Sequence, residues 1–256
     1  MPPLLSHWNQ VSRRLRSRPK IALFLDFDGT LARLRPRPDQ VSIDSSVRQA
    51  LSALARSPRF RIWVISGRRK ADVHSRIRIP GIHYLGLHGW EGRGLNGQRG
   101  GLAEETHRGL TRLLSQVKCA CADVPGLWIE DKEYAFAVHY ADVREADVAP
   151  ARSILDSVTK PYSEYVRIQR GKNVWEVLPR ALEDKGSAVK QQLALLRAGY
   201  LAMYLGDDQV DEPAFAALRD GVTVRVGPPC RSKAQYRLSG VAEVRRFLHR
   251  LRTEFA

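Results

Sequence analysis

The sequence predicts an α/β fold in which a parallel sheet is covered by helices on both faces and is interrupted once by a smaller α+β unit. Two observations predict the sheet: short runs of apolar residues recur along the chain, and helical patterns alternate with them. Uninterrupted apolar runs are typical of parallel strands buried on both faces. Their alternation with helices is typical of successive βαβ units. A different order of elements in the middle of the chain predicts the second unit.

The elements of the parallel-sheet part follow from apolar spacing. Its predicted strands lie at residues 21–25, 61–65, 82–86, 201–205 and 222–226. Its predicted helices lie at about 45–56, 69–77, 187–198, 211–219 and 241–252. Before the first strand, apolar residues at spacings of three and four predict a short amphipathic helix, carried by Leu4, Trp8, Val11 and Leu15. We therefore expect residues 1–19 to form an N-terminal helical extension.

The segment between about residues 104 and 180 has a different pattern. A helix at 104–118 precedes the strands LWIED and YAFAVHY, and a helix at 147–158 precedes EYVRIQ and VWEVL. Two helix-strand-strand units predict a sheet with helices on one face and the other face open. We expect residues 20–103 and 181–256 to form one domain and residues 104–180 an inserted one. The length of 256 residues alone allows either one domain with an insertion or two domains.

The chain is strongly basic, with 42 Lys and Arg residues against 27 Asp and Glu residues and a formal net charge of +15. A basic surface can attract nucleic acid, an anionic membrane or an anionic small substrate. The Arg residues are scattered, and no nucleic-acid motif with interleaved aromatic residues is present. We therefore expect no nucleic-acid partner, although a basic nucleic-acid-binding protein remains an alternative.

Cysteine usage and hydropathy bear on the cellular setting. The three cysteines, Cys119, Cys121 and Cys230, include no C-x-x-C pair, which disfavours a disulfide framework or a zinc site. No stretch approaches the ~20 apolar residues that span a bilayer, and the N-terminus has no apolar run of signal-peptide length. We expect a cytoplasmic monomer without a membrane partner.

The first chemical signal is LFLDFDGTL, which places Asp26 and Asp28 at the carboxyl end of the first strand. In an open α/β sheet, ligands bind beyond the carboxyl ends of the strands. Asp-Gly alone is common turn chemistry. A buried strand that runs into D-x-D-G-T is harder to explain as a turn.

Three more signals lie at other predicted strand ends or helix starts. Ser66-Gly67-Arg68 offers a hydroxyl and backbone N–H groups for phosphate oxygens. Lys185 precedes a helix and offers a positive charge. The segment GDDQVDE clusters Asp207, Asp208 and Asp211, whose oxygens suit Mg²⁺. Each signal alone has an ordinary structural explanation, but all four together favour a phosphate site.

These four motifs, in this order, resemble those of the haloacid dehalogenase superfamily of phosphohydrolases. The resemblance implies a Rossmann-like core with an inserted α+β open-faced sandwich as cap domain. It implies that Asp26 is the nucleophile, Asp28 the general acid and base, and Ser66 and Lys185 the phosphate holders. It further implies Mg²⁺ as cofactor, with Asp26, Asp28, Asp207 and Asp208 at the metal and Asp211 behind them. Gly67 and Arg68 fall in the second motif and are expected near the substrate.

Within that superfamily the chain resembles the trehalose-6-phosphate phosphatases. The resemblance rests on GDDQVDE and on the stretches GLHGWE (86–91), IEDK (129–132), VHY (138–140), and RGK leading to WEVLP (170–179). It departs at Val210, where the family usually has Thr, and at Trp90, where it has a smaller residue. Carried over by position, the resemblance implies that Glu130, Lys132 and Glu176 bind sugar hydroxyls. His88 and Lys172 are implied at the junction of cap and core, and both are expected, with Gly89, among the substrate-binding residues.

The chemistry is consistent with these roles. An ionised carboxylate is repelled by a dianionic phosphate, so the metal and Lys185 must neutralise charge. The leaving sugar oxygen needs a proton, which Asp28 can supply. Glu130 and Lys132 are two apart on a predicted strand and so face the same way, although a charged strand edge is the ordinary alternative. We therefore expect hydrolysis of trehalose 6-phosphate. A related capped phosphatase acting on a sucrose-phosphate or mannosylglycerate-precursor type of substrate is the alternative.

Overall fold

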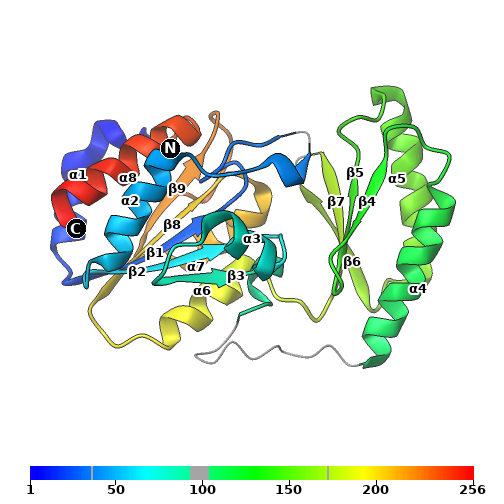
Figure 1. Ribbon diagram of the computed structural model, residues 1–256, viewed down its shortest axis with the longest axis horizontal. Coiled ribbons are helices and arrows are strands. Elements are labelled where there is room, and N and C mark those ends of the chain that lie inside the picture. The colour runs from blue at the N-terminus through cyan, green and yellow to red at the C-terminus, as the bar shows by residue number, and fades with distance from the viewer. Residues whose placement is uncertain (36, 93–103, 172) are drawn as a thin grey trace. The chain divides into compact units, whose positions relative to one another are not determined.

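The computed structural model describes residues 1–35, 37–92, 104–171 and 173–256 (Figure 1). The chain divides into two compact units: Met1–Arg99 together with Asp184–Ala256, and Gly100–Glu183. The predicted domain boundary at residue 103 lies outside the described residues. In the described parts of the chain, no helix combines the length and the apolar character needed to cross a membrane.

The first unit is built on a parallel sheet of six strands in the order β10-β9-β8-β1-β2-β3. These strands are β1 (Lys20–Asp26), β2 (Phe60–Ile65), β3 (Ile82–Leu85), β8 (Tyr200–Gly206), β9 (Val222–Val226) and β10 (Tyr236–Leu238). The five apolar runs that predicted strands all form them, and the predicted fold class is confirmed. The sequence analysis missed β10 because this edge strand has only three residues and half-exposed Arg237 interrupts its apolar pattern.

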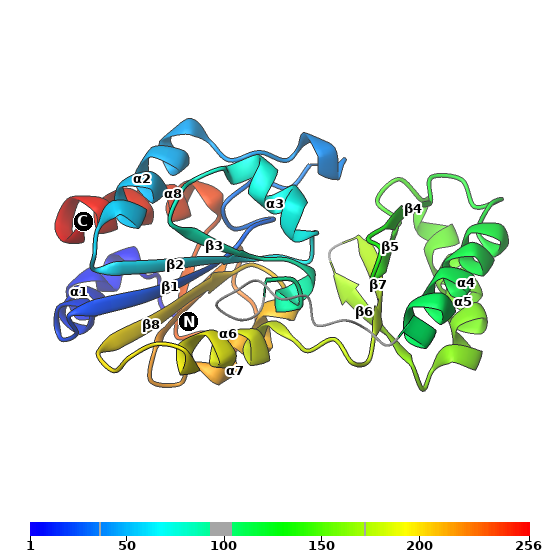
Figure 2. The same cartoon turned by 60° about the horizontal axis from the view of Figure 1, so that its bottom comes forward.

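Helices cover both faces of this sheet (Figure 2). One face carries α1 (Trp8–Arg16), α2 (Ser45–Arg56), α3 (Lys70–Ile77) and α8 (Val241–Phe255), which share a core with Ile21, Leu23 and Leu25 of β1. The other face carries α6 (Lys185–Ala194) and α7 (Glu212–Ala217), which pack with Phe24 and Trp63. Alternate residues of β1 therefore enter opposite cores, as the two-residue period of a strand requires.

Helix α6 differs in extent from the prediction. Helix α6 ends at Ala194 rather than at 198, and the chain then turns through Gly199, whose φ of +103° favours glycine. The N-terminal helix is confirmed: Trp8, Val11 and Leu15 are buried, and the Trp8 ring meets Phe247 of α8 edge to face.

The second unit is an antiparallel sheet of four strands in the order β4-β5-β7-β6. Its strands are β4 (Trp128–Asp131), β5 (Phe136–His139), β6 (Val166–Gly171) and β7 (Val174–Pro179). Helices α4 (Glu104–Ala120) and α5 (Glu145–Thr159) share one core with Phe136, Val138 and Val177. Because side chains alternate along a strand, the opposite face of the sheet receives Glu130, His139 and Glu176.

Candidate active site

The ends of the central strands of the first unit carry the predicted chemical groups. Asp26 is the last residue of β1, Ser66 follows β2, and Asp207 follows β8. Parallel strands end at one edge of their sheet, so these residues gather there. Lys185, the first residue of α6, joins them, because its Nζ lies 2.6 Å from Asp26 Oδ1.

Lys185 lies between two carboxylates. Its Nζ also donates to Asp211 Oδ1 at 2.7 Å, and its side chain is only 1% exposed. Burial alone would lower the pKa of Lys185, but Asp211 and Asp26 outweigh burial and raise this pKa well above its usual value. The ammonium group therefore stays charged. Asp184 caps the start of α6 by accepting a hydrogen bond from Ser187 N, and this cap fixes the backbone at Lys185.

Asp211 is fully buried and organises this lysine. Besides Lys185, Asp211 accepts from the Tyr204 hydroxyl at 2.7 Å and from Asp208 N at 2.9 Å. The sequence analysis did not select Tyr204, which lies inside the apolar run of β8. The signal was available, because a buried tyrosine hydroxyl almost always needs a hydrogen-bond partner.

Three carboxylates at this edge could hold a divalent cation. One oxygen each from Asp26, Asp207 and Asp211 lie within 4.8 Å of one another. Asp26 Oδ2 is buried and accepts no hydrogen bond from the described residues. Asp211 already accepts from three donors, so Asp26 and Asp207 have more capacity left for a metal. Clustered carboxylate oxygens are the ligands that Mg²⁺ prefers.

The electrostatics of this cluster also favour a cation. Burial, together with Asp211 and Asp207, raises the pKa of Asp26 well above its usual value, although Lys185 opposes this effect. Burial, with Asp211 and Asp208, raises the pKa of Asp207 to about 7. Burial is the largest cause of both shifts, and the neighbouring carboxylates add to it. A divalent cation bound to these carboxylates would favour their ionised forms.

Asp208, also expected at the metal, is not part of the three-carboxylate cluster found among the described residues. Its Oδ1 accepts from Gln209 N and caps the short turn at Gln209–Asp211. The loop after β1 passes close to Asp207 at Gly29. A side chain would not fit there, because a Cβ at Gly29 would lie 2.0 Å from Asp207 Oδ2. The φ of Gly29 is +81°. A side chain at this position would therefore disturb the acidic cluster.

Asp28, two residues beyond Asp26, is held by Arg68. Arg68 Nε donates to Asp28 Oδ2 at 2.7 Å and Arg68 Nη2 donates to Asp28 Oδ1 at 2.8 Å. Arg68 Nη1 reaches Asp72 Oδ2 at 2.9 Å. Burial would lower the pKa of Arg68, but the two aspartates outweigh burial and raise it. This paired geometry fixes the direction of the Asp28 carboxylate.

The turn after β2 is built from Ser66, Gly67 and Arg68. Ser66 is 1% exposed, and its Oγ accepts from Arg68 N at 3.1 Å. His88 supports this turn by donating its backbone N–H to Ser66 O at 2.8 Å. Gly89 then passes close to α6, since a Cβ there would lie 2.2 Å from Ala188 Cβ. His88 and Gly89 thus link the Ser66 turn to the helix of Lys185.

In the second unit, the predicted sugar-binding residues lie on the sheet face opposite the helices. Lys132 Nζ lies 2.6 Å from Glu176 Oε1, and both side chains are buried. Glu130 Oε2 lies 3.0 Å from His139 Nε2. Trp128 stacks on His139 with ring centroids 3.9 Å apart and planes inclined by 4°. The face therefore presents carboxylates, an ammonium group and aromatic rings.

One residue of this face was not expected from the sequence. Trp128 was not selected there, although it is two residues before Glu130 and so shares its face. Lys172, expected at the junction of the two units, lies outside the residues that the structure describes.

Comparison with known families and sequences gives a consistent result. The profile of the family described as trehalose-phosphatase matches residues 24–241. The trehalose-6-phosphate phosphatase of Escherichia coli (strain K12) is 31% identical over 245 residues, which cover 91% of this chain and 87% of that protein. An uncharacterized glycosyl hydrolase of Mycobacterium tuberculosis is 33% identical over 265 residues. Those residues are 98% of this chain, but the chain spans only 20% of that relative's length.

Solved structures share the fold. The C-terminal domain of the Candida albicans trehalose-6-phosphate phosphatase superposes with a TM-score of 0.85 at 21% identity and covers 98% of both chains. A structure described as a trehalose-6-phosphate phosphatase related protein superposes with a TM-score of 0.75 at 25% identity, over 91% of this chain and 97% of that one.

Proposed function

The chain belongs to the trehalose-phosphatase family, and from this premise we propose that it hydrolyses trehalose 6-phosphate to trehalose and phosphate with Mg²⁺ as cofactor. The observation that carries the proposal is the state of Asp26. This carboxylate is buried at the end of β1, has one oxygen bound by Lys185 and keeps the other without a hydrogen bond from the described residues. A carboxylate held in this way is suited to attack a phosphorus atom.

Asp26 acts as the nucleophile in this proposal. Its Oδ2 forms a bond to phosphorus while the bond from phosphorus to the sugar oxygen breaks, which gives an aspartyl phosphate and the free sugar. Water then attacks the aspartyl phosphate and releases phosphate. Lys185, which already contacts Asp26, reduces the repulsion between the carboxylate and the phosphate dianion.

Asp28 moves the proton in both half-reactions. It protonates the leaving sugar oxygen in the first half and takes a proton from the attacking water in the second. Arg68 holds the Asp28 carboxylate through two hydrogen bonds in the substrate-free protein. Substrate binding must therefore loosen at least one of these bonds, and Asp28 must take up a proton from solvent before it can protonate the leaving oxygen.

Mg²⁺ fits the acidic cluster, because Asp26 and Asp207 offer carboxylate oxygens in a site with excess negative charge. Asp28, through its backbone carbonyl, and Asp208 complete the set that we propose near the metal. When bound, the ion neutralises charge on the phosphate group that is transferred. Asp211, the third carboxylate of the cluster, already accepts from Lys185, and we propose that it orients this lysine rather than the metal.

The phosphate is held at the turn after β2. The Ser66 hydroxyl and the backbone around Gly67 lie at the edge where β1 and β2 end, and they offer donors to phosphate oxygens. His88 and Gly89 keep this turn in register with α6. We propose that His88 and Gly89 affect substrate binding indirectly, by holding the turn that binds the phosphate.

The sugar is bound by the second unit in this proposal. Glu130, Lys132 and Glu176 project from one sheet face and combine acceptors with a donor, which suits a disaccharide with many hydroxyl groups. Lys132 and Glu176 are already paired, so sugar hydroxyls would bridge or replace an existing bond. Such a pair rejects analogues that lack the matching hydroxyl.

A panel of sugar phosphates tests the function. The purified chain is incubated with Mg²⁺ and trehalose 6-phosphate, glucose 6-phosphate or sucrose 6-phosphate, and released phosphate is measured. We expect kcat/KM for trehalose 6-phosphate to exceed the others by at least about tenfold, the effect of one additional hydrogen bond to a charged group. Equal turnover of trehalose 6-phosphate and glucose 6-phosphate would contradict the substrate.

A further inference from the structure

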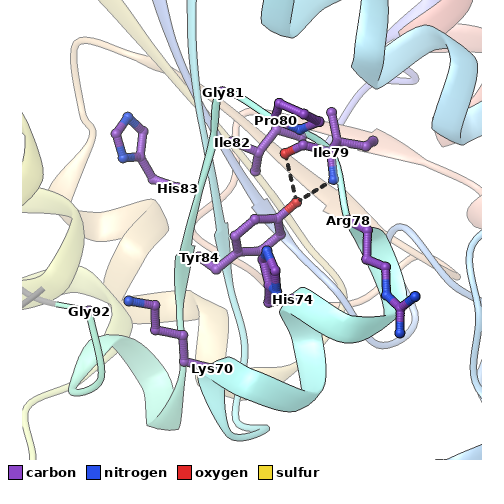
Figure 3. Close-up of a pocket in the computed structure, with 10 residues that line it drawn as sticks. All are labelled: Lys70, His74, Arg78, Ile79, Pro80, Gly81, Ile82, His83, Tyr84 and Gly92. Atoms are coloured by element: carbon purple, nitrogen blue, oxygen red, sulfur yellow. Dashed lines mark hydrogen bonds between the residues drawn. The ribbon is translucent and has the colours of Figure 1, made fainter.

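A second cavity lies in the first unit, beside the edge strand β3 and helix α3. Its volume is about 570 Å³, within the usual range for sites that hold small ligands. Figure 3 shows its lining side chains. None of the residues assigned above to nucleophile, acid, phosphate or metal is among the described residues that line it.

The lining of this cavity carries basic groups and no described acidic residue. Lys70, His74 and Arg78 follow one another at spacings of four along α3 and just past its end, and His83 joins them from β3. Among the described residues, no carboxylate forms an ion pair with the side chain of Lys70 or Arg78. Two permanent positive charges therefore border a hollow without counter-charges, an arrangement that attracts anions.

Glu91, an acidic residue that bonds to the backbone of Lys70, is already engaged elsewhere. Glu91, next to the lining residue Gly92, accepts from Arg69 Nε at 2.8 Å and from the backbone N–H of Lys70 at 2.5 Å. The Glu91 carboxylate thus holds the start of α3 in place. The ammonium group of Lys70 is left for another partner.

The floor of the cavity is fixed. The Tyr84 hydroxyl donates to Ile79 O and accepts from Ile79 N, both at 3.1 Å, and His74 packs edge to face on the Tyr84 ring. Figure 3 shows Tyr84 in the middle, with Lys70 and His83 on one side and Arg78 turned away on the other. Because His83 and Tyr84 are consecutive residues of β3, their side chains point to opposite faces of the strand. Lys70 and His83 lie on one side of the strand in Figure 3, and Tyr84 with His74 lies on the other. Arg78 contributes charge from farther away.

His83 can donate a hydrogen bond without becoming charged. Its Nε2 accepts from Arg61 Nε at 3.2 Å, so the ring proton of the neutral imidazole lies on Nδ1. Burial and Arg61 lower the pKa of His83. The imidazole stacks on Trp63 with ring centroids 5.2 Å apart, which limits its orientation.

We propose that this cavity binds a small phosphate-bearing anion, at a site separate from the one that contains Asp26. Lys70 provides the main charge and His83 a neutral donor, both on the same side of β3 in Figure 3. Two sources share this chemistry: inorganic phosphate and a phosphate monoester.

The test is a titration of the full chain, labelled with ¹³C at histidine, with orthophosphate at constant ionic strength and pH. The imidazole signals of His74 and His83 report on the cavity directly and do not depend on turnover. A second titration uses phenylphosphonate, whose carbon-phosphorus bond is not hydrolysed. The His83 signal should shift with saturation, and the His74 signal, across β3 from it, should shift less. Tighter binding of phenylphosphonate identifies a monoester as the ligand, and tighter binding of orthophosphate identifies free phosphate.

Three variants that each remove one positive charge show how much each charge contributes to phosphate binding. Lys70→Gln should weaken phosphate binding about tenfold, as expected for one charged hydrogen bond. Arg78→Gln should have a smaller effect because its side chain points away. Lys190→Gln removes an exposed charge of the same unit and should leave the affinity unchanged. The proposal is overturned if the His83 signal does not move, if chloride moves it equally, or if Lys190→Gln weakens binding as much as Lys70→Gln.

Discussion

The ammonium group of Lys185 lies 2.6 Å from the carboxylate of Asp26, although 159 residues separate the two in sequence. The whole second unit is inserted between them along the chain. The proposed nucleophile and its counter-charge therefore belong to segments on either side of the insertion.

Asp26→Asn should lower phosphate release from trehalose 6-phosphate by on the order of a thousandfold or more, because an amide cannot form the covalent intermediate. The same loss should occur with a small aryl phosphate, since the nucleophile serves every substrate. Asp39→Asn changes an exposed acid in the same unit and should keep full activity. Circular dichroism of each variant checks the fold. Full phosphate release by Asp26→Asn would show that another group is the nucleophile.

In metal-free protein, stability should fall as pH rises from about 4 to about 7. The pKa of Asp207 rises from an ordinary value of 3.8 to about 7 on folding. The folded protein thus binds an additional proton between these values, and stability is lost as that proton dissociates. Asp207→Asn should flatten this part of the profile in thermal unfolding with chelator present, whereas Asp220→Asn at an exposed position should not.

Addition of Mg²⁺ at pH 7.5 should restore the folding stability that the metal-free protein loses as pH rises. A ligand that binds only the folded protein raises the melting temperature, by an amount that grows with its concentration over its dissociation constant. The rise should be much smaller in Asp207→Asn, which has lost a carboxylate ligand. An equal rise in wild type and variant would place the ion away from Asp207.

Tyr204→Phe tests the support of Lys185. Loss of the hydroxyl removes a hydrogen bond to the ionised Asp211, which is expected to cost about 1.5–3 kcal/mol in the free energy of unfolding. The kcat should fall with little change in KM, because Tyr204 is not expected to touch substrate. Tyr200→Phe, on the same strand, is the matched control, since Tyr200 is only half-buried and its ring contacts Lys20. Unchanged kcat in Tyr204→Phe would limit the hydroxyl to a structural role.

Part of the candidate site could be predicted from the sequence. Asp26, Ser66 and Asp207 directly follow apolar strands, so the shared edge of a parallel sheet was enough to predict that they gather. The partners of these groups could not be predicted in the same way. Arg68 was expected near the substrate, yet its guanidinium binds Asp28 and Asp72, a choice that depends on how the turn after β2 faces the loop after β1.

The same limit applies to the second unit. Glu130 and Lys132 were expected on one face because they are two residues apart. The bond from Lys132 to Glu176 joins residues 44 positions apart and depends on the pairing order β4-β5-β7. Sequence spacing predicts which way a side chain points within one strand, but not which strand lies beside it.

Glu176→Gln tests whether this face selects the sugar. The substitution keeps the size of the side chain but weakens its bond to Lys132 and to any sugar hydroxyl. We expect KM for trehalose 6-phosphate to rise about tenfold or more, the effect of one lost charged hydrogen bond. Hydrolysis of a small aryl phosphate should be unchanged, because that substrate has no sugar to bind.

The matched control for this last variant is Glu164→Gln, an exposed change in the same unit that should alter neither substrate. Glu130→Gln should show the same selective effect as Glu176→Gln if both carboxylates bind the sugar. A parallel loss with the aryl phosphate would mean that the substitution disturbs the first unit or the fold. A normal KM for trehalose 6-phosphate in both variants would move sugar recognition to other residues, of which stacked Trp128 and His139 are the first to examine, because they share this face.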